Sequence, residues 1–282
     1  RKEVAYLMAS IKLGETASYV SNYDPSLLEP IARSQSRILL LEGKGAPFIG
    51  LDIWTAYEVS WLLPGGKPQV AIAEFVFLAD SDAIIESKSL KYYLNSLNQT
   101  RFESVAAVKA QLQADLTAAS GADVQVTLYP VDAYPKALAP PQGSCVDDLQ
   151  CEIDSYRPDS NMLVFNSTQV EGVCLYSHLL KSNCPVTGQP DWATVWIQYS
   201  GRELLPESYL RYVISFREHQ DFHENCVEKI FCDLLAQGEL DALAVYARYT
   251  RRGGLDINPY RATPNLGKAL PAALNMCRIA RQ

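Results

Sequence analysis

The apolar positions in the first half of the chain predict a strand, two helices and a second strand. The segment from Gln69 to Phe77 is almost continuously apolar, as in a buried strand. Alternation from Val124 to Tyr129 predicts the second strand. Between them, apolar residues recur at helical spacing, first at Leu90, Tyr93, Leu94 and Leu97 and then at Val105, Val108, Leu112 and Leu116.

The second half repeats this order. Thr194 to Tyr199 and Leu243 to Tyr249 predict strands. The helical positions between them are Leu210, Val213 and Ile214, then Val227, Ile230, Phe231 and Leu234. Pro68 and Pro190 lie 122 positions apart, and corresponding helix positions differ by 120 to 122. Chains of the α+β class can resemble themselves by chance, but the matched offsets favour a tandem duplication.

An additional hairpin is predicted before the first copy. One arm runs from Asp52 to Leu62, the turn from Leu63 to Gly66, and the second arm from Gln69 to Phe77. Three prolines stiffen the segment from Tyr134 to Gly143. We therefore expect an N-terminal module over residues 1–134, a linker over 135–143 and a C-terminal module over 144–282.

The composition indicates a folded chain whose partners are small molecules. The chain has 282 residues, of which 48% are hydrophobic and 20% charged, enough for a substantial core. No apolar run approaches the ~20 residues that span a bilayer, so no membrane contact is expected. The net charge of −7 argues against a nucleic-acid binder. A local basic group suits a phosphate-bearing small molecule: Arg248, Arg251, Arg252 and Arg261.

The cysteines indicate a reducing compartment. All seven lie in the second half, at Cys145, Cys151, Cys174, Cys184, Cys226, Cys232 and Cys277. An odd number in a long chain, with no Cys-x-x-Cys pair, favours reduced thiols in the cytoplasm over a disulfide framework.

The segment from Cys184 to Asp191 has the residues of a covalent active site. It contains Pro185, Gly188 and Pro190, so the chain can turn back and bring the thiol and the carboxyl together. A thiolate is a strong nucleophile and a carboxyl group can deliver a proton. The alternative is that Cys184 is a small buried hydrophobe, as free cysteines commonly are.

The segment from Glu86 to Lys91 opens the first predicted helix. Its two serines and two lysines, beside the free N–H groups and positive dipole of a helix start, could hold phosphates. The alternative is an ordinary capped and solvated helix start. The chain has neither a Gly-x-Gly-x-x-Gly motif nor a Walker loop, which argues against a Rossmann or P-loop site.

Two further segments carry polar chemistry. His223 and Glu224 open a later helix and could hydrogen-bond the edge of a flat heterocycle, or simply cap the helix and favour its dipole. Cys226 and Cys232 face roughly opposite ways on that helix, so with His223 they make a poor metal set and no metal is expected. The segment from Arg251 to Pro259 has two arginines and a glycine pair, which suits a phosphate or a solvated basic turn.

These segments occur together and in order in one family. The chain resembles the NADPH-dependent 7-cyano-7-deazaguanine reductases, the nitrile reductases of queuosine biosynthesis, in their long two-module form. The resemblance runs from about Tyr19 to the C-terminus, and residues 31–47 and 132–143 match only loosely. The sharpest matches are Asp52–Thr55, Ile85–Asn95, Ser177–Asp191, Phe216–Cys226 and Tyr246–Asn258.

The resemblance implies a fold and a set of site residues. The fold is α+β, with tandem tunnelling-fold modules, antiparallel sheets with paired helices on one side, and a homodimer of two-module chains. Cys184 would be the nucleophile and Asp191 the proton donor. The implied substrate-binding residues are Ile85, Glu86, Ser87, His223 and Glu224. The implied NADPH contacts are Ser87, Lys88, Arg252 and Gly253.

The resemblance also implies a reaction. The nitrile of 7-cyano-7-deazaguanine would be reduced by four electrons to the amine of 7-aminomethyl-7-deazaguanine, through a thioimide on Cys184 and at the expense of two NADPH. Two alternatives stay open. One is a zinc-dependent hydrolase of the same fold, like the GTP cyclohydrolases, which stoichiometric zinc in the purified protein would favour. The other is a non-catalytic purine-binding module, which predicts the loss of Cys184 or Asp191, although both are present.

Overall fold

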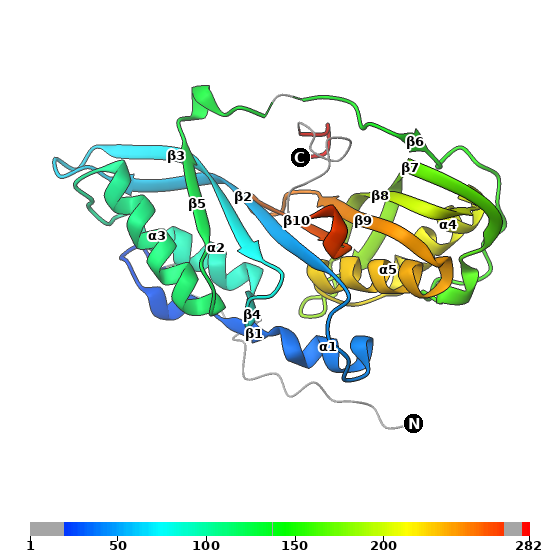
Figure 1. Ribbon diagram of the computed structural model, residues 1–282. Helices are drawn as coiled ribbons and strands as arrows, with labels where there is room; N and C mark the ends of the chain where they lie inside the picture. The colour runs from blue at the N-terminus through cyan, green and yellow to red at the C-terminus, as the bar shows by residue number, and fades with distance from the viewer. Residues whose placement is uncertain (1–19, 137, 268–277) are drawn as a thin grey trace.

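One eight-stranded sheet organises the protein in the computed structural model, which describes residues 20–136, 138–267 and 278–282 (Figure 1). Its strands, in spatial order, are β5 (Gln125–Tyr129), β3 (Pro68–Leu78), β2 (Ile49–Leu62), β10 (Leu255–Ala262), β9 (Leu240–Tyr249), β8 (Pro190–Leu204), β7 (Phe165–Asn183) and β6 (Ser144–Cys145). All neighbours are antiparallel except the short β6–β7 pair. A separate antiparallel pair joins β1 (Pro30–Ala32) and β4 (Ala83–Ile85).

Five α-helices occur within the described residues. They are α1 (Arg33–Leu41), α2 (Ser87–Ser96), α3 (Val105–Ser120), α4 (Pro206–Ile214) and α5 (His223–Gly238). Short 3-10 turns are found at Pro25–Leu27, Val131–Ala133, Ser160–Met162, Ser215–Glu218 and Pro264–Leu266. None of the helices in these ranges is both long and apolar enough to cross a membrane.

The two halves of the chain use the same order of elements. The hairpin β2–β3 is followed by α2, α3 and β5, and the hairpin β7–β8 is followed by α4, α5 and β9. The strands and helices expected from apolar spacing are confirmed, and the helices lie on one side of the sheet (Figure 1). The α+β class is therefore confirmed. The origin by duplication, the tunnelling-fold modules and their boundaries stay predictions.

The hairpin expected before the first copy is confirmed, because β2 pairs with β3. A matching hairpin before the second copy, in which β7 pairs with β8, was not expected. Most of β7 is exposed or half-buried, and three register shifts interrupt its pairing, so it lacks a regular alternation. Strand β10 was also missed. All of its residues are buried, but the polar side chains of Asp256, Asn258 and Arg261 interrupt any apolar run.

Strands β2 and β10 join the two halves of the sheet, in a register that runs from Leu255 opposite Ala56 to Ala262 opposite Ile49. On the helix side, each half has its own apolar core. Successive strand residues point to opposite faces, and a third cluster lies on the other face: Trp196, Ala244, Tyr246, Tyr260, Ala262 and Ile279. The C-terminal residues thus pack on the face that the helices leave open.

Buried charges accompany this junction. Arg261 on β10 is fully buried, with its guanidinium 2.7 Å from both Asp52 on β2 and Glu228 on α5. Arg33 and Arg37 of α1 add ion pairs of 2.6 Å to Asp52 and Glu228 respectively. Although burial raises it, the pKa of Asp52 is lowered overall by the two neighbouring arginines. The network fixes β2, β10 and α5 relative to one another, and the candidate site lies beside them.

Candidate active site

The turn between β7 and β8 presents Cys184. Its N–H group donates to the carbonyl of Gln189 at 2.8 Å, and its own carbonyl accepts from the N–H group of Gly188 at 2.9 Å. Gly188 has a φ of +69°, a left-handed conformation that glycine adopts without steric cost. The chain therefore folds back as the sequence predicts, and Cys184 and Asp191 line one cavity.

This cavity gathers residues from both halves of the chain. Its lining consists of Trp54, Ile85, Glu86, Ser87, Cys184, Pro185, Asp191, Asp221, Phe222, His223, Glu224, Arg252 and Ile257. Every residue predicted for catalysis or substrate binding is in this set. The free space is about 10 Å³, room for about one water molecule. A larger molecule can enter only if lining side chains move.

Asp191 is buried among cationic groups. Its Oδ1 atom lies 2.9 Å from Nη1 of Arg252, in an ion pair. Burial raises the pKa of Asp191, and the charges of Arg252, Lys91 and Lys181 oppose this rise without cancelling it. The carboxyl group therefore stays protonated to a higher pH than an ordinary aspartic acid, which suits a proton donor.

His223 is the first residue of α5 and is neutral at pH 7. Burial, followed by the charges of Arg252 and Lys91, lowers its pKa to about 3. Its Nε2 atom lies 3.7 Å from Oδ1 of Asp191, and because the ring is uncharged this contact is not an ion pair. The ring packs edge-on against Tyr249, with centroids 4.0 Å apart. His223 can therefore offer a neutral hydrogen bond at a fixed position.

Glu224 places a carboxyl group with an unused oxygen on the cavity wall. The residue is 2% exposed, and its Oε1 atom has no hydrogen-bond partner among the residues that the structure describes. Burial and then the negative charge of Asp52 raise its pKa to about 8. A buried oxygen without a partner is costly, so this atom is suited to an N–H group of a bound molecule.

The first half contributes the start of α2. Strand β4 ends at Ile85, and Glu86 is the N-cap of the helix that begins at Ser87. The carboxylate of Glu86 accepts from the N–H groups of Lys88 at 3.0 Å and Ser89 at 2.7 Å. The capping role considered for this segment is thus confirmed. Capping also fixes Glu86 on the wall of the cavity.

A second cavity of about 400 Å³ adjoins the first. It is lined by Lys88 and Gly253, the two predicted cofactor contacts that do not line the first cavity. Gly253 and Gly254 have φ values of +63° and +78° and form a tight two-residue turn between the bridged residues Arg252 and Leu255, in the connection from β9 to β10. Lys91 and Arg252 line a small space against Asp191, and Lys91 also borders the second cavity. The predicted substrate and cofactor residues are therefore contiguous.

Several lining residues were not among the predicted site residues: Lys91 of the small space, and Trp54, Pro185, Asp221, Phe222 and Ile257 of the first cavity. Lys91 lies one helical turn after Ser87, on the same face of α2, and this spacing could have indicated it. Burial and the charge of Arg252 lower the pKa of Lys91. Trp54 and Phe222 complete the apolar wall, and no spacing in the sequence points to either.

Two family models and several relatives match this chain. A family model described as "Nitrile reductase, 7-cyano-7-deazaguanine-reductase N-term" matches residues 19–128, and one described as "QueF-like protein" matches residues 190–267. An "NADPH-dependent 7-cyano-7-deazaguanine reductase" from Saccharophagus degradans is 59% identical over 276 residues, covering 98% of this chain and 100% of the relative. A protein of the same name from Teredinibacter turnerae is 57% identical, covering 97% of this chain and 99% of the relative.

A third relative and one solved structure are less similar to this chain. A protein of the same name from Azoarcus sp. is 51% identical, covering 89% of this chain and 90% of the relative. The solved structure of an apo archaeosine synthase QueF-Like is 19% identical, with a TM-score of 0.28, over 39% of this chain and 97% of that one. This structural similarity is too low to carry an argument. The identities above and the two family models do show the family, and this chain belongs to the NADPH-dependent 7-cyano-7-deazaguanine reductases.

Proposed function

We propose that this protein reduces the nitrile of 7-cyano-7-deazaguanine to an aminomethyl group through a covalent bond to Cys184. The observation that carries the proposal is the shared cavity, in which the Cys184 thiol and the Asp191 carboxyl lie with Glu224 at its wall. Membership of the family makes the protein an NADPH-dependent oxidoreductase, as expected from the sequence.

The substrate would bind between Glu224, His223 and the start of α2. The aminopyrimidinone edge of a deazaguanine presents N–H donors, and Oε1 of Glu224 is the unpartnered acceptor. Donors arriving at that oxygen favour its charged form and lower its raised pKa. Ile85 and Trp54 would contact the flat face of the heterocycle, since both line the cavity.

The covalent step needs a nucleophile and an acid on opposite ends of the nitrile. The sulfur of Cys184 adds to the nitrile carbon, and one electron pair of the triple bond moves to nitrogen. Asp191 delivers a proton to that nitrogen, and the proton lost by the thiol restores the acid. The product is a thioimide in which no atom has been lost. Burial raises the pKa of Asp191, which favours the acid form that this step requires.

The reduction proceeds in two stages. When bound, NADPH supplies a hydride at each stage. After the first hydride has been added, the former nitrile carbon carries both an amino group and the Cys184 sulfur. Expulsion of the Cys184 thiolate then leaves an imine. Addition of the second hydride converts the imine carbon into the carbon of the aminomethyl group. Asp191 is the acid within reach for the protons that nitrogen takes up.

The residues present fit an NADPH site. Lys88, Lys91 and Arg252 place cationic groups around the second cavity and its connection to Asp191. Gly253 lets the backbone of the β9–β10 turn approach a phosphate closely. Ser87, at the start of α2, adds a hydroxyl group where the helix dipole is positive.

The alternatives are less well supported. Membership of the reductase family argues against the zinc-dependent hydrolase, and the joint presence of Cys184 and Asp191 in one cavity argues against a non-catalytic purine-binding module. A homodimer and a cytoplasmic location stay predictions.

The test is a mass measurement followed by a rate. Incubation with 7-cyano-7-deazaguanine, without NADPH, should raise the intact mass of the protein by the mass of the nitrile. The adduct should form in Cys151→Ser, which changes a thiol outside the cavity, and should be absent in Cys184→Ala. Oxidation of NADPH that persists unchanged in Cys184→Ala would refute the role of the thiol, even in an active reductase.

A further inference from the structure

Three metal-ligating side chains lie together outside the active site, where β6 pairs with β7. The Sγ atom of Cys145, a carboxylate oxygen of Asp147 and a ring nitrogen of His178 all lie within 4.8 Å of one another. No other such group of three occurs in the described parts of the chain. Ligands of tetrahedral zinc are about 3.5 Å apart. Cys145 is exposed, so its side chain can close this difference without disturbing the core.

The carboxylate of Asp147 is held in place by its neighbours. Its Oδ1 atom accepts from the hydroxyl group of Ser177 at 2.6 Å, and its Oδ2 atom accepts from the backbone N–H group of His178 at 2.9 Å. Each carboxylate oxygen has a second lone pair. Asp147 is thus fixed in position and can still coordinate an ion.

His178 has the surroundings of a ligand histidine. Its Nδ1 atom lies 2.8 Å from the hydroxyl oxygen of Thr194, a buried residue. A hydrogen bond donated by Nδ1 leaves the lone pair on Nε2, the arrangement by which outer partners orient metal-binding histidines.

The charges around the group allow a divalent cation. Arg281 lies beside it, donating to the carbonyl of His178 at 3.1 Å and to Thr194 at 2.8 Å. The carboxylate of Asp147 and a thiolate at Cys145 outnumber this charge. Binding would displace the proton of the Cys145 thiol, because the thiolate is the metal-binding form.

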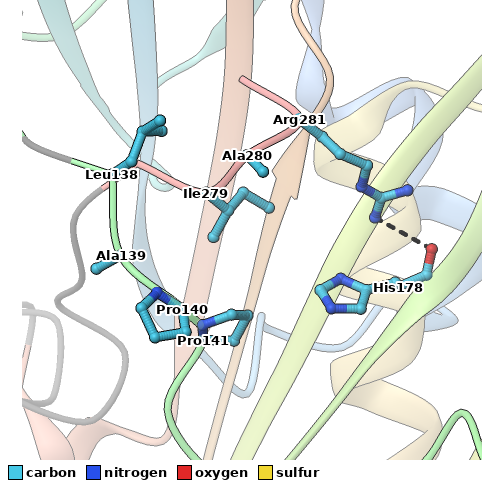
Figure 2. A pocket seen from close by; sticks show the side chains of 8 residues that line it. All are labelled: Leu138, Ala139, Pro140, Pro141, His178, Ile279, Ala280 and Arg281. Atoms are coloured by element: carbon cyan, nitrogen blue, oxygen red, sulfur yellow. Dashed lines mark hydrogen bonds between the residues drawn. The ribbon is translucent and has the colours of Figure 1, made fainter.

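The group is accessible and remote from the catalytic turn. Figure 2 shows His178 on the wall of a cavity of about 540 Å³, with Arg281 and the segment Leu138–Pro141 also lining it. Cys184 follows the C-terminal end of β7, six residues from His178 and about 20 Å away at the rise of an extended strand. An ion at this place could not reach the nitrile.

We propose that Cys145, Asp147 and His178 bind a zinc ion that clamps β6 to β7. Sulfur, nitrogen and oxygen ligands in this combination suit Zn²⁺, with water in the fourth position. Strand β6 has only two residues and follows the linker from the first half, so few backbone hydrogen bonds hold it. The ion stabilises the place where the second half of the chain begins to fold onto the sheet.

The experiment uses the full chain, freed of metal by a chelator, with Zn²⁺ and Co²⁺ as probes. One equivalent of Co²⁺ should give a thiolate-to-cobalt charge-transfer band, and Zn²⁺ should displace it and raise the melting temperature. Cys145→Ser should abolish the band, and Asp147→Asn and His178→Gln should weaken binding at least tenfold. Cys174→Ser, which removes a different thiol on β7, should retain the band.

Each contrary outcome is decisive. The absence of a stoichiometric band, or a band unchanged in all three ligand variants, overturns the proposal. A band that survives Cys145→Ser but is lost in Cys184→Ala places the metal in the active site instead, and would revive the hydrolase alternative. The proposal does not rest on the reductase mechanism, because the expected band and melting shift are the same in Cys184→Ala.

Discussion

Replacing Arg252 by alanine should change the pH dependence of the covalent step. In the structure its Nη1 atom lies 2.9 Å from Oδ1 of Asp191. This positive charge favours the carboxylate form, which cannot donate a proton. Burial keeps the pKa of Asp191 raised in spite of it. Removal of the guanidinium should therefore raise that pKa further and extend the acid form to higher pH.

The expected size of the shift follows from the geometry. Two unit charges about 4 Å apart interact by about 4 kcal/mol at an effective dielectric constant of about 20. Solvent reduces this value, because the side chain of Arg252 is 35% exposed, although that of Asp191 is only 7% exposed. Exposed pairs contribute about 1 kcal/mol or less. A value near 1.4 kcal/mol, between these limits, corresponds to about one pKa unit.

Formation of the thioimide in the absence of NADPH isolates this effect from cofactor binding. The adduct requires Asp191 to be protonated, so its rate should fall as the pH rises through the pKa of that group. In Arg252→Ala, the falling limb of this pH–rate profile should move to higher pH by about one unit. Arg252→Lys, which retains the charge, should leave it near the wild-type position.

If the falling limb of the pH–rate profile lies at the same pH in Arg252→Ala and in the wild type, the electrostatic reasoning is refuted. A limb that moved to lower pH would contradict its sign. A limb that moved equally in Arg252→Ala and Arg252→Lys would show that the shape of the guanidinium, and not its charge, sets the protonation of Asp191.

Three further variants test the site and the fold. Asp191→Asn should slow formation of the adduct by about 10²- to 10⁴-fold while the protein still binds the nitrile, as measured by rapid-mixing mass spectrometry and calorimetry. Arg261→Met leaves two buried carboxylates without their shared partner and should cost about 3–5 kcal/mol in urea unfolding; a loss below 1 kcal/mol would contradict the buried network. Gly253→Ala forces alanine to a φ of +63° and places its Cβ 3.3 Å from Cδ of Lys91, so the KM for NADPH should rise. Gly172→Ala has the same strain, at a φ of +62° with nothing within 4 Å, and should leave that KM unchanged.

The sequence predicted those elements whose buried side chains are apolar, at helical spacing or in a strand-length run. The helix positions at Leu90 and Val227 and the strand around Val195 are buried as their spacing indicated. Strand β7 escaped because bulges and an exposed surface remove its period, and β10 escaped because its buried side chains are polar. Periodicity reports on apolar burial, so it cannot detect a strand buried by ion pairs and hydrogen bonds.

The residues of the site were likewise only partly predictable from the sequence. The turn at Cys184 could be found from composition, because proline and glycine specify the chain reversal. The role of Glu86 was open between a helix cap and a ligand, and the structure shows the cap. Lys91 was overlooked because its contribution depends on long-range neighbours: its pKa is shifted by burial and by Arg252, which is far away in the sequence.

The junction of β2 and β10 links stability to recognition. The charge of Asp52 raises the pKa of Glu224, while Arg33 and Arg261 lower it. The same three residues form the ion pairs that hold the two halves together. Removing Arg261 should therefore both weaken the fold and raise the pKa of Glu224. If Glu224 binds the heterocycle as a carboxylate, the weakened binding in Arg261→Met should recover as the pH rises, whereas a purely structural defect would persist at every pH.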